Sequence, residues 1–341
     1  MNSFVGSLRL HAASRKLAAP LLLFCLGIAT TQAKAQSLGY EGPTGLLVTP
    51  LALTATSPAK GVGLPAISYH FLAGGPVIGD FSTVSATVGI AKRFEIGYTH
   101  ELQIAPGGSL IGLGPKLTPL FDSGLDIVHF KANITPGFIS KVGTFSVGGV
   151  YRLNDQIGVN INNLAAKLIA GANITPINAE EKTANGDVYL VGTKIITQLG
   201  KKAPIIVSAG LRGTNAALWG LGGNSPGFEG KAFGSTALVL TGPAKSTIIL
   251  ASEISQQPQH ISSATATATF GSARAATLFD IPTSESYALR LVPFARHKLN
   301  IDAAVLHAGG FIDNSLLNKL AGGRVDLDMR ARLAFAISYG F

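Results

Sequence analysis

The chain has 341 residues, enough for one large domain or two ordinary ones. Charged residues are only 13% of the chain, whereas soluble domains typically contain about 25%. The formal charge of +9 is scattered along the sequence, with none of the basic runs typical of nucleic-acid-binding proteins, so we expect no nucleic-acid partner.

Residues 1–35 have the pattern of a secretory signal peptide. Basic residues precede an apolar stretch over residues 17–29, and Ala33-Lys34-Ala35 forms a small-x-small cleavage site. We predict export and cleavage after Ala35. The mature chain would then have 23 basic residues against 18 acidic ones and no cysteine, because Cys25 is removed with the leader.

Residues 36–61 show no regular alternation of apolar and polar side chains. Gly and Pro interrupt this segment repeatedly, as in Gly42-Pro43-Thr44-Gly45 and at Pro50. We predict either a periplasmic lead-in or a segment that plugs the domain formed by residues 62–341.

Residues 62–341 repeatedly alternate between apolar and polar side chains, the period of a strand with one apolar and one polar face. The last stretch is the clearest, since its odd positions from Val325 to Phe341 are all apolar. The predicted strands are 64–72, 80–90, 93–102, 124–134, 142–152, 186–199, 203–214, 230–241, 244–255, 284–293, 297–307 and 325–341.

The connections between these strands alternate between short turns and long loops. This rhythm is typical of a transmembrane β-barrel with periplasmic turns and extracellular loops. We therefore predict an all-β fold, an antiparallel transmembrane barrel of about 12 strands. If residues 165–175 formed a strand in the long segment 153–185, the number would rise to 14.

Charged residues on the polar strand faces are predicted to line the lumen. Basic residues outnumber acidic ones among them, which favours passage of anionic solutes if the lumen is open. Alternatively, these side chains pair with one another and fill the interior. The candidates are Arg93, Glu95, Glu101, His129, Lys131, Arg152, Lys194, Arg212, Lys245, Glu253, Arg290, Lys298, Asp302, Asp326, Asp328, Arg330 and Arg332.

The sequence contains little that is typical of a catalytic or metal site. The histidines do not have metal-ligand spacing, so we expect neither a metal nor another cofactor. His260-Ile261-Ser262 resembles part of the His-x-Ser-Asn-Gly motif of the outer-membrane phospholipase A family, but Ser263 and Ala264 replace its Asn-Gly. We therefore do not expect an enzyme, and an outer-membrane lipid hydrolase is the third alternative.

The signal-peptide pattern, the hairpin rhythm and the terminal Ser338-Tyr339-Gly340-Phe341 together resemble Gram-negative outer-membrane β-barrel proteins. The resemblance implies an outer-membrane location, contact with membrane lipid and lipopolysaccharide, and recognition of Tyr339 and Phe341 by the barrel-assembly machinery. The stretch from Gly42 to Pro50 is similar to the start of barrels associated with exopolysaccharide export. The predicted function is a porin-like channel for small polar or anionic solutes. The alternative is a plugged accessory barrel for polysaccharide export or surface interaction.

Overall fold

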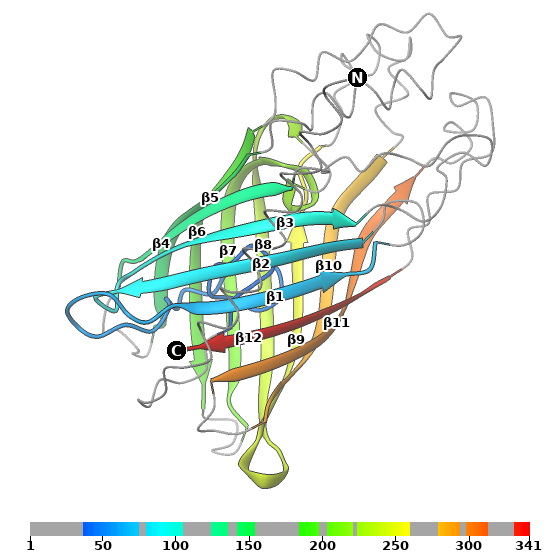
Figure 1. Cartoon of the computed structure of the whole chain (residues 1–341). Helices are drawn as coiled ribbons and strands as arrows, with labels where there is room; N and C mark the ends of the chain where they lie inside the picture. The colour runs from blue at the N-terminus through cyan, green and yellow to red at the C-terminus, as the bar shows by residue number, and fades with distance from the viewer. Residues whose placement is uncertain are drawn as a thin grey trace, which may run out of the picture. The chain divides into compact units, whose positions relative to one another are not determined.

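The computed structural model describes a closed barrel of twelve antiparallel strands (Figure 1). It describes residues 37–74, 80–104, 124–135, 142–153, 184–197, 203–220, 224–259, 279–293, 298–312 and 331–341. Each strand is hydrogen-bonded to its sequence neighbours, and the first strand pairs with the last.

The strands follow one another around the barrel, and two short 3-10 helices interrupt them. The strands are β1 (Ala66–Leu72), β2 (Asp80–Ile90), β3 (Phe94–Ile104), β4 (Leu125–Asn133), β5 (Thr144–Leu153), β6 (Ala184–Ile196), β7 (Ile205–Ala216), β8 (Asn224–Thr241), β9 (Thr247–Gln256), β10 (Phe279–Val292), β11 (Leu299–Ile312) and β12 (Arg332–Gly340). The 3-10 helices are η3 (Ala217–Gly220) and η4 (Pro243–Lys245).

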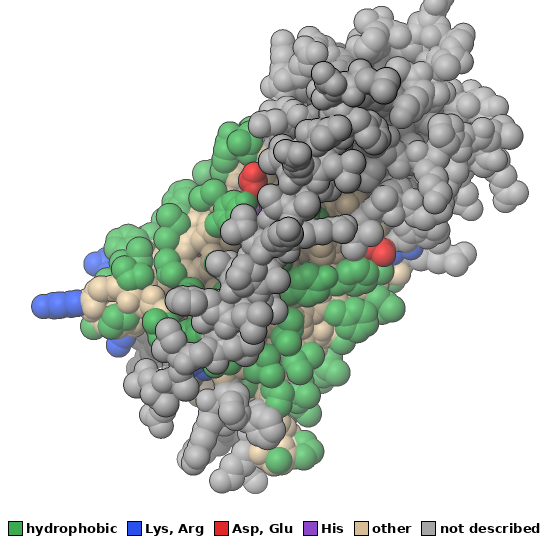
Figure 2. Space-filling model, in the orientation of Figure 1, with side chains coloured by type: hydrophobic (Ala, Val, Ile, Leu, Met, Phe, Trp, Pro, Cys, Tyr) green, Lys and Arg blue, Asp and Glu red, His purple; other side chains and the backbone are tan. Residues whose placement is uncertain are grey.

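The two faces of the wall have opposite chemistry. Outward side chains form an apolar surface, which Figure 2 shows as a broad green area over the strands. Inward side chains are mostly polar or small. Lipid on the outside requires this inversion of a soluble core, and a closed ring leaves no sheet edge unpaired within the membrane. Among the outward apolar residues are Val84, Ile96, Val128, Leu190, Leu250, Leu289, Ile301, Phe335 and Ile337.

The described part of the chain contains no helix long and apolar enough to span a bilayer.

The predicted fold is confirmed: the barrel has twelve strands and is all antiparallel. The alternative of fourteen strands is wrong, because β5 pairs directly with β6 and the ring is complete without a further strand. Residues 165–175 lie outside the described residues. β12 pairs with both β1 and β11, with Tyr339 opposite Ile67 on one side and Leu299 on the other.

One end of the barrel carries the short turns, and we call it the turn end. The observed strand boundaries agree best with the predicted ones at this end. There Ala91 and Lys92 both have positive φ, as in the two-residue turn that matches the twist of a hairpin. At the opposite end, the loop end, several strands extend beyond their predicted limits. β8 begins at Asn224 rather than residue 230, and β11 continues to Ile312 rather than residue 307. These extensions carry Gly and polar residues, so they show little alternation.

Residues 37–57, which we call the plug, lie inside the barrel. Figure 1 shows this dark-blue segment running within the ring of strands before it continues into β1. The plug has little regular structure, with isolated bridges such as Leu38 to Thr44 and Gly45 to Pro50. It leaves the lumen at the turn end, where the Lys92 N–H donates a hydrogen bond to Ser57 Oγ (2.7 Å).

Candidate functional site

The plug folds back on itself inside the lumen through its own main-chain hydrogen bonds. The Tyr40 N–H donates to the Leu47 carbonyl (2.6 Å), and the Leu46 N–H donates to the Thr49 carbonyl (3.1 Å). Gly45 is required in this turn, because a Cβ there would lie 2.5 Å from the Thr49 carbonyl oxygen. Gly42 has φ +99°, a conformation that side chains rarely adopt. The glycines that broke the sequence pattern therefore make the compact turns of the plug.

Glu253 of β9 binds three consecutive main-chain N–H groups of the plug. Leu47 and Val48 donate at 3.2 and 3.1 Å, and Thr49 donates its N–H at 2.8 Å and its hydroxyl at 2.6 Å. Ser286 of β10 donates to the same carboxylate. Successive N–H groups that converge in this way form an anion-binding nest. The plug therefore supplies most of the hydrogen bonds that stabilise this buried carboxylate.

Glu95 of β3 makes a second polar contact with the plug. Its carboxylate accepts hydrogen bonds from the Thr44 N–H (2.9 Å), the Thr44 hydroxyl (2.5 Å) and the Ala55 N–H (2.7 Å). Lys131 lies opposite Glu95 on β4 and pairs with it at 3.1 Å. The Lys131 ammonium also donates to the Thr44 carbonyl (2.8 Å). One ion pair of the wall thus binds both main-chain groups of Thr44.

Hydroxyl groups of the wall bind further main-chain groups of the plug. Plug carbonyls accept hydrogen bonds at 3.1 Å or less, and the Ala52 N–H donates to a wall hydroxyl at 2.8 Å. These hydroxyl groups therefore bind the plug through its backbone. The wall residues concerned are Thr83 for Tyr40, Thr99 for Glu41, Thr87 for Gly42, and Ser146 and Thr193 for Ala52.

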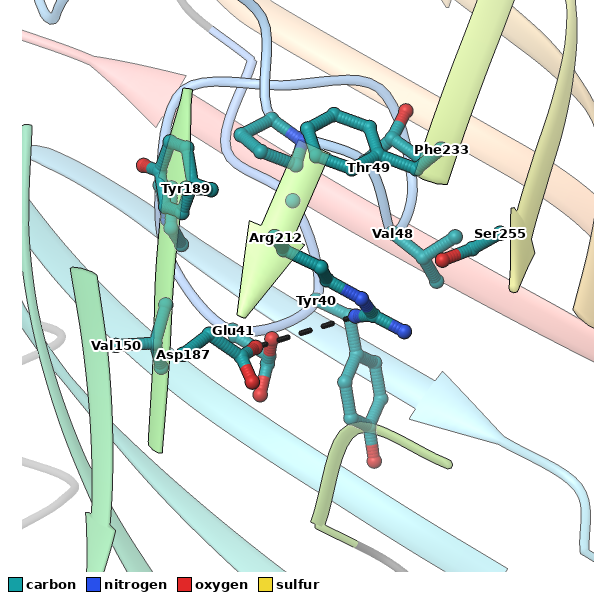
Figure 3. A pocket seen from close by; sticks show the side chains of 13 residues that line it. Tyr40, Glu41, Val48, Thr49, Val150, Asp187, Tyr189, Arg212, Phe233 and Ser255 are labelled. Atoms are coloured by element: carbon teal, nitrogen blue, oxygen red, sulfur yellow. Dashed lines mark ion pairs between the residues drawn. The ribbon is translucent and has the colours of Figure 1, made fainter. Parts of the chain in front are cut away.

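A charged cluster lies beside the tip of the plug, toward the loop end. Arg152 donates to Glu41 of the plug and, at 2.8 Å, to Asp187 of β6. Arg212 of β7 lies 3.9 Å from Asp187, the ion pair that Figure 3 marks with a dashed line. Tyr40 lies next to this cluster. Burial and, after it, the Glu101 carboxylate raise the pKa of Tyr40, so its hydroxyl stays protonated.

The remaining space in this part of the lumen is small. Leu46, Leu47 and Leu51 of the plug are buried in two clusters of apolar side chains together with residues of the wall. The cavity between Tyr40, Tyr189 and Arg212 (Figure 3) has a volume of about 30 Å³, room for on the order of one water molecule. The plug therefore fills the lumen where it contacts the wall.

The structure places ten of the predicted lumen residues inside the barrel, where they are buried. Most of them come together around the plug or in pairs on the wall, whereas Lys298 lies at the turn end, just before β11. These residues are Glu95, Glu101, His129, Lys131, Arg152, Arg212, Glu253, Arg290, Lys298 and Asp302.

Three predicted lumen residues lie near the ends of strands or in the turns between them. Arg93 lies in the turn before β3 and is exposed, and Lys194 is exposed on the face opposite the inward Thr193. Lys245 lies in η4, outside the strands. All three are near the turn end, where both faces of a strand can meet water and charge no longer identifies the inner face. Arg332 is partly buried at the start of β12, whereas Asp326, Asp328 and Arg330 lie outside the described residues.

The expected excess of basic residues in the lumen is not found among the described wall residues. Five basic side chains are buried there: Lys131, Arg152, Arg212, Arg290 and Lys298. Five acidic ones balance them: Glu95, Glu101, Asp187, Glu253 and Asp302. Asp187 is not among the predicted lumen residues, although it lies two residues from Tyr189 on the same inward face. Apolar residues on both faces of β6 obscured the alternation.

Other predicted functional residues fall partly outside the described structure. His260 and Ser262 lie outside it, so it says nothing of a catalytic pair. Tyr339 faces outward near the turn end of β12, and Phe341 follows that strand directly. Among the described residues, no group of three or more potential metal ligands comes together.

The sequence matches no family model and no curated protein. Its fold is similar to that of the NanC porin, with a TM-score of 0.41, 6% identity and coverage of 81% of this chain and 98% of that one. It is also similar to that of LpxR from Salmonella typhimurium, with a TM-score of 0.41, 7% identity and coverage of 81% of this chain and 100% of that one. A third similar structure is Wzi, an outer membrane protein involved in capsule assembly in Escherichia coli and described as a carbohydrate-binding β-barrel. Its TM-score is 0.26 and its identity 11%, and the match covers 77% of this chain and 52% of that one.

Proposed function

We propose that this protein is a Gram-negative outer-membrane channel for small polar solutes, closed in the present conformation by its own N-terminal plug. The observation that carries the proposal is the plug's polar contact with the wall through Glu253, Glu95 and hydroxyl side chains. Without the plug, the wall would be a polar, water-compatible lining of the kind that forms an aqueous pore. Its balanced buried charge supports passage of polar solutes without a preference for anions.

The chemistry of the interface favours a plug that can move. Burying ionised groups is costly, and apolar residues of similar volume often stabilise a permanent filling better. The wall instead holds the plug with carboxylates and hydroxyls, which water can also hydrate. Release of the plug would therefore exchange many protein hydrogen bonds for water hydrogen bonds, and its main cost would be exposure of the apolar side chains that pack on the plug's leucines.

Single-channel recording in planar bilayers tests this function. Wild-type protein should conduct rarely, and the Gly45→Val variant should conduct in frequent steps, because the added side chain disrupts the plug's own turn and leaves every wall residue unchanged. Glu285→Gln, on the outward face of β10, is a matched control that should behave as the wild type. Heat-modifiable mobility on gels would show that each variant is folded.

Silence of both wild type and folded Gly45→Val at high protein load would contradict the channel. That result would favour the accessory alternative, a barrel whose lumen stays closed and whose loops act at the cell surface.

A further inference from the structure

We infer that the lumen wall around Glu253 is a peptide-binding site, and that the plug occupies it as an intramolecular ligand. The ligand class is a short peptide whose turn presents three successive N–H groups beside apolar side chains. The inference deepens the proposed function and rests on it, because it assigns the residues that would keep the channel closed.

The main observation is that Glu253 has no basic partner among the described residues of the wall. Three other buried wall carboxylates have one: Glu95 pairs with Lys131, Asp187 with Arg152, and Asp302 with Arg290. Glu101 has no ion pair among the described residues either, but only Glu253 binds main-chain N–H groups of the plug without a basic partner. Glu253 is only 2% exposed, and its described donors are the Ser286 hydroxyl and the plug's Leu47, Val48 and Thr49. A buried carboxylate without these donors would be strongly unfavourable. Glu253 is therefore suited to an anion-binding turn of a peptide.

The surroundings of Glu253 supply the second part of the site. Leu46 and Leu51 of the plug pack against Ala237 of β8, with Ile206, Ile249 and Ala251 beside them. This apolar surface lies next to a carboxylate and to hydroxyl groups that bind peptide carbonyls. The combination recognises a peptide by the shape of its turn and by its main chain, with leucine-sized side chains on either side of the N–H run.

The wall binds the side chains of Glu41, Thr44 and Thr49, and its other hydrogen bonds to the plug are mainly to the main chain. Ala52 is bound through its N–H and its carbonyl, by Thr193 and Ser146. Gly42 is bound through its carbonyl, by Thr87. Backbone recognition of this kind is not restricted to one covalently attached segment. A separate peptide that forms the same turn can occupy the lumen when the plug is out.

The test adds a synthetic peptide to the full-length Gly45→Val protein. A labelled peptide with the wild-type sequence of residues 36–57 should bind, measured by fluorescence anisotropy, and should block the conductance of this variant. Replacing the amides at Val48 and Thr49 with esters removes two N–H donors and should weaken binding roughly 10- to 100-fold or more. A peptide with Val48→Ala keeps the amides and is the matched control, expected to bind within a few-fold of the original.

The wall side of the site is tested with the same peptide on Gly45→Val/Glu253→Gln, where binding should fall to a similar extent. Unchanged binding to this double variant, or to the ester peptide, would overturn the assignment. Peptide binding without any conductance in Gly45→Val would retain the site and reject the channel. Conductance without peptide binding would retain the channel and reject the peptide site.

A second measurement applies if Gly45→Val does not fold. The mature chain is predicted to have no cysteine, so Ala52→Cys in the fully buried part of the plug can be labelled selectively. A charged, membrane-impermeant thiol reagent should label this cysteine at least ten-fold faster when Glu253→Gln is also present. Equal labelling rates with and without Glu253→Gln would overturn the inference.

Discussion

Arg290 and Asp302 face each other across β10 and β11 and form two parallel hydrogen bonds of 2.7 and 2.8 Å inside the barrel. Such a fork of guanidinium and carboxylate is a strong and geometrically specific pair. Arg290→Met should destabilise the folded barrel by about 3–5 kcal/mol, because it leaves a buried carboxylate without its partner. Urea unfolding of the protein in lipid vesicles measures this difference.

Lys194→Met is the control for this prediction, since Lys194 is exposed and should change stability by less than about 0.5 kcal/mol. The double variant Arg290→Met/Asp302→Leu should recover most of the loss, because it removes both charges. A single variant as stable as the wild type would show that the pair does not stabilise the barrel.

Arg290 and Lys194 also show what the sequence could predict. Alternation identifies the inner face in the middle of a strand, as for Arg290, and fails near the end of a strand, as for Lys194.

At the scale of the strand, the outer face of β12 provides a depth-dependent test of the membrane position. Phe335 is about half exposed and lies between Phe71 of β1 and Ala303 of β11. An arginine in lipid near the middle of a barrel strand costs about 2–4 kcal/mol, and much less near the interface. Phe335→Arg should therefore lower the free energy of unfolding in vesicles by that amount.

His307→Arg on β11 is the matched control, because His307 faces outward toward the loop end and is already polar. It should change stability by no more than about 1 kcal/mol. Similar effects of both substitutions would contradict a bilayer centred on the middle of β12.

The strands themselves were predictable from sequence because lipid outside and polar contacts inside impose a strict two-residue period. β2 has the predicted limits, Asp80 to Ile90. The prediction fell short where this constraint ends. The first residues of β8, from Asn224 to Gly230, are mainly polar or glycine, so neither face was recognisable. Hydrogen bonding to β7, which continues to Ala216, extends the strand there with a register shift.

At the scale of the whole molecule, the end of the chain is predicted to direct assembly. β12 ends at Gly340, so deletion of Phe341 leaves every strand pair of the ring in place. We expect the shortened protein to reach the outer membrane several-fold more slowly in cells, yet to unfold in urea at nearly the same concentration as the wild type. Pulse-labelling with membrane fractionation measures the first effect. Normal insertion of the shortened chain would contradict a role for Phe341 as an assembly signal.

The occupied lumen illustrates what sequence alone could not establish. The contacts of Glu253 with Leu47, Val48 and Thr49 join residues more than 200 positions apart, and they involve main-chain N–H groups that every residue except proline possesses. A single inward acid and a run of main-chain N–H groups leave no recognisable pattern in the sequence that would link them. The sequence could therefore suggest that residues 36–61 are a plug, and could identify Glu253 as an inward acid, without connecting the two.

Residues 58–65 connect the plug to β1. A short tether of this kind keeps a ligand at an effective concentration on the order of millimolar. Even a peptide site with a dissociation constant of only about 1 μM would then be empty in roughly one molecule in a thousand. That ratio corresponds to about 4 kcal/mol, an amount that one strong competing contact at the plug or its tether could supply. Proximity, rather than tight binding, would then keep the barrel shut while leaving it easy to open.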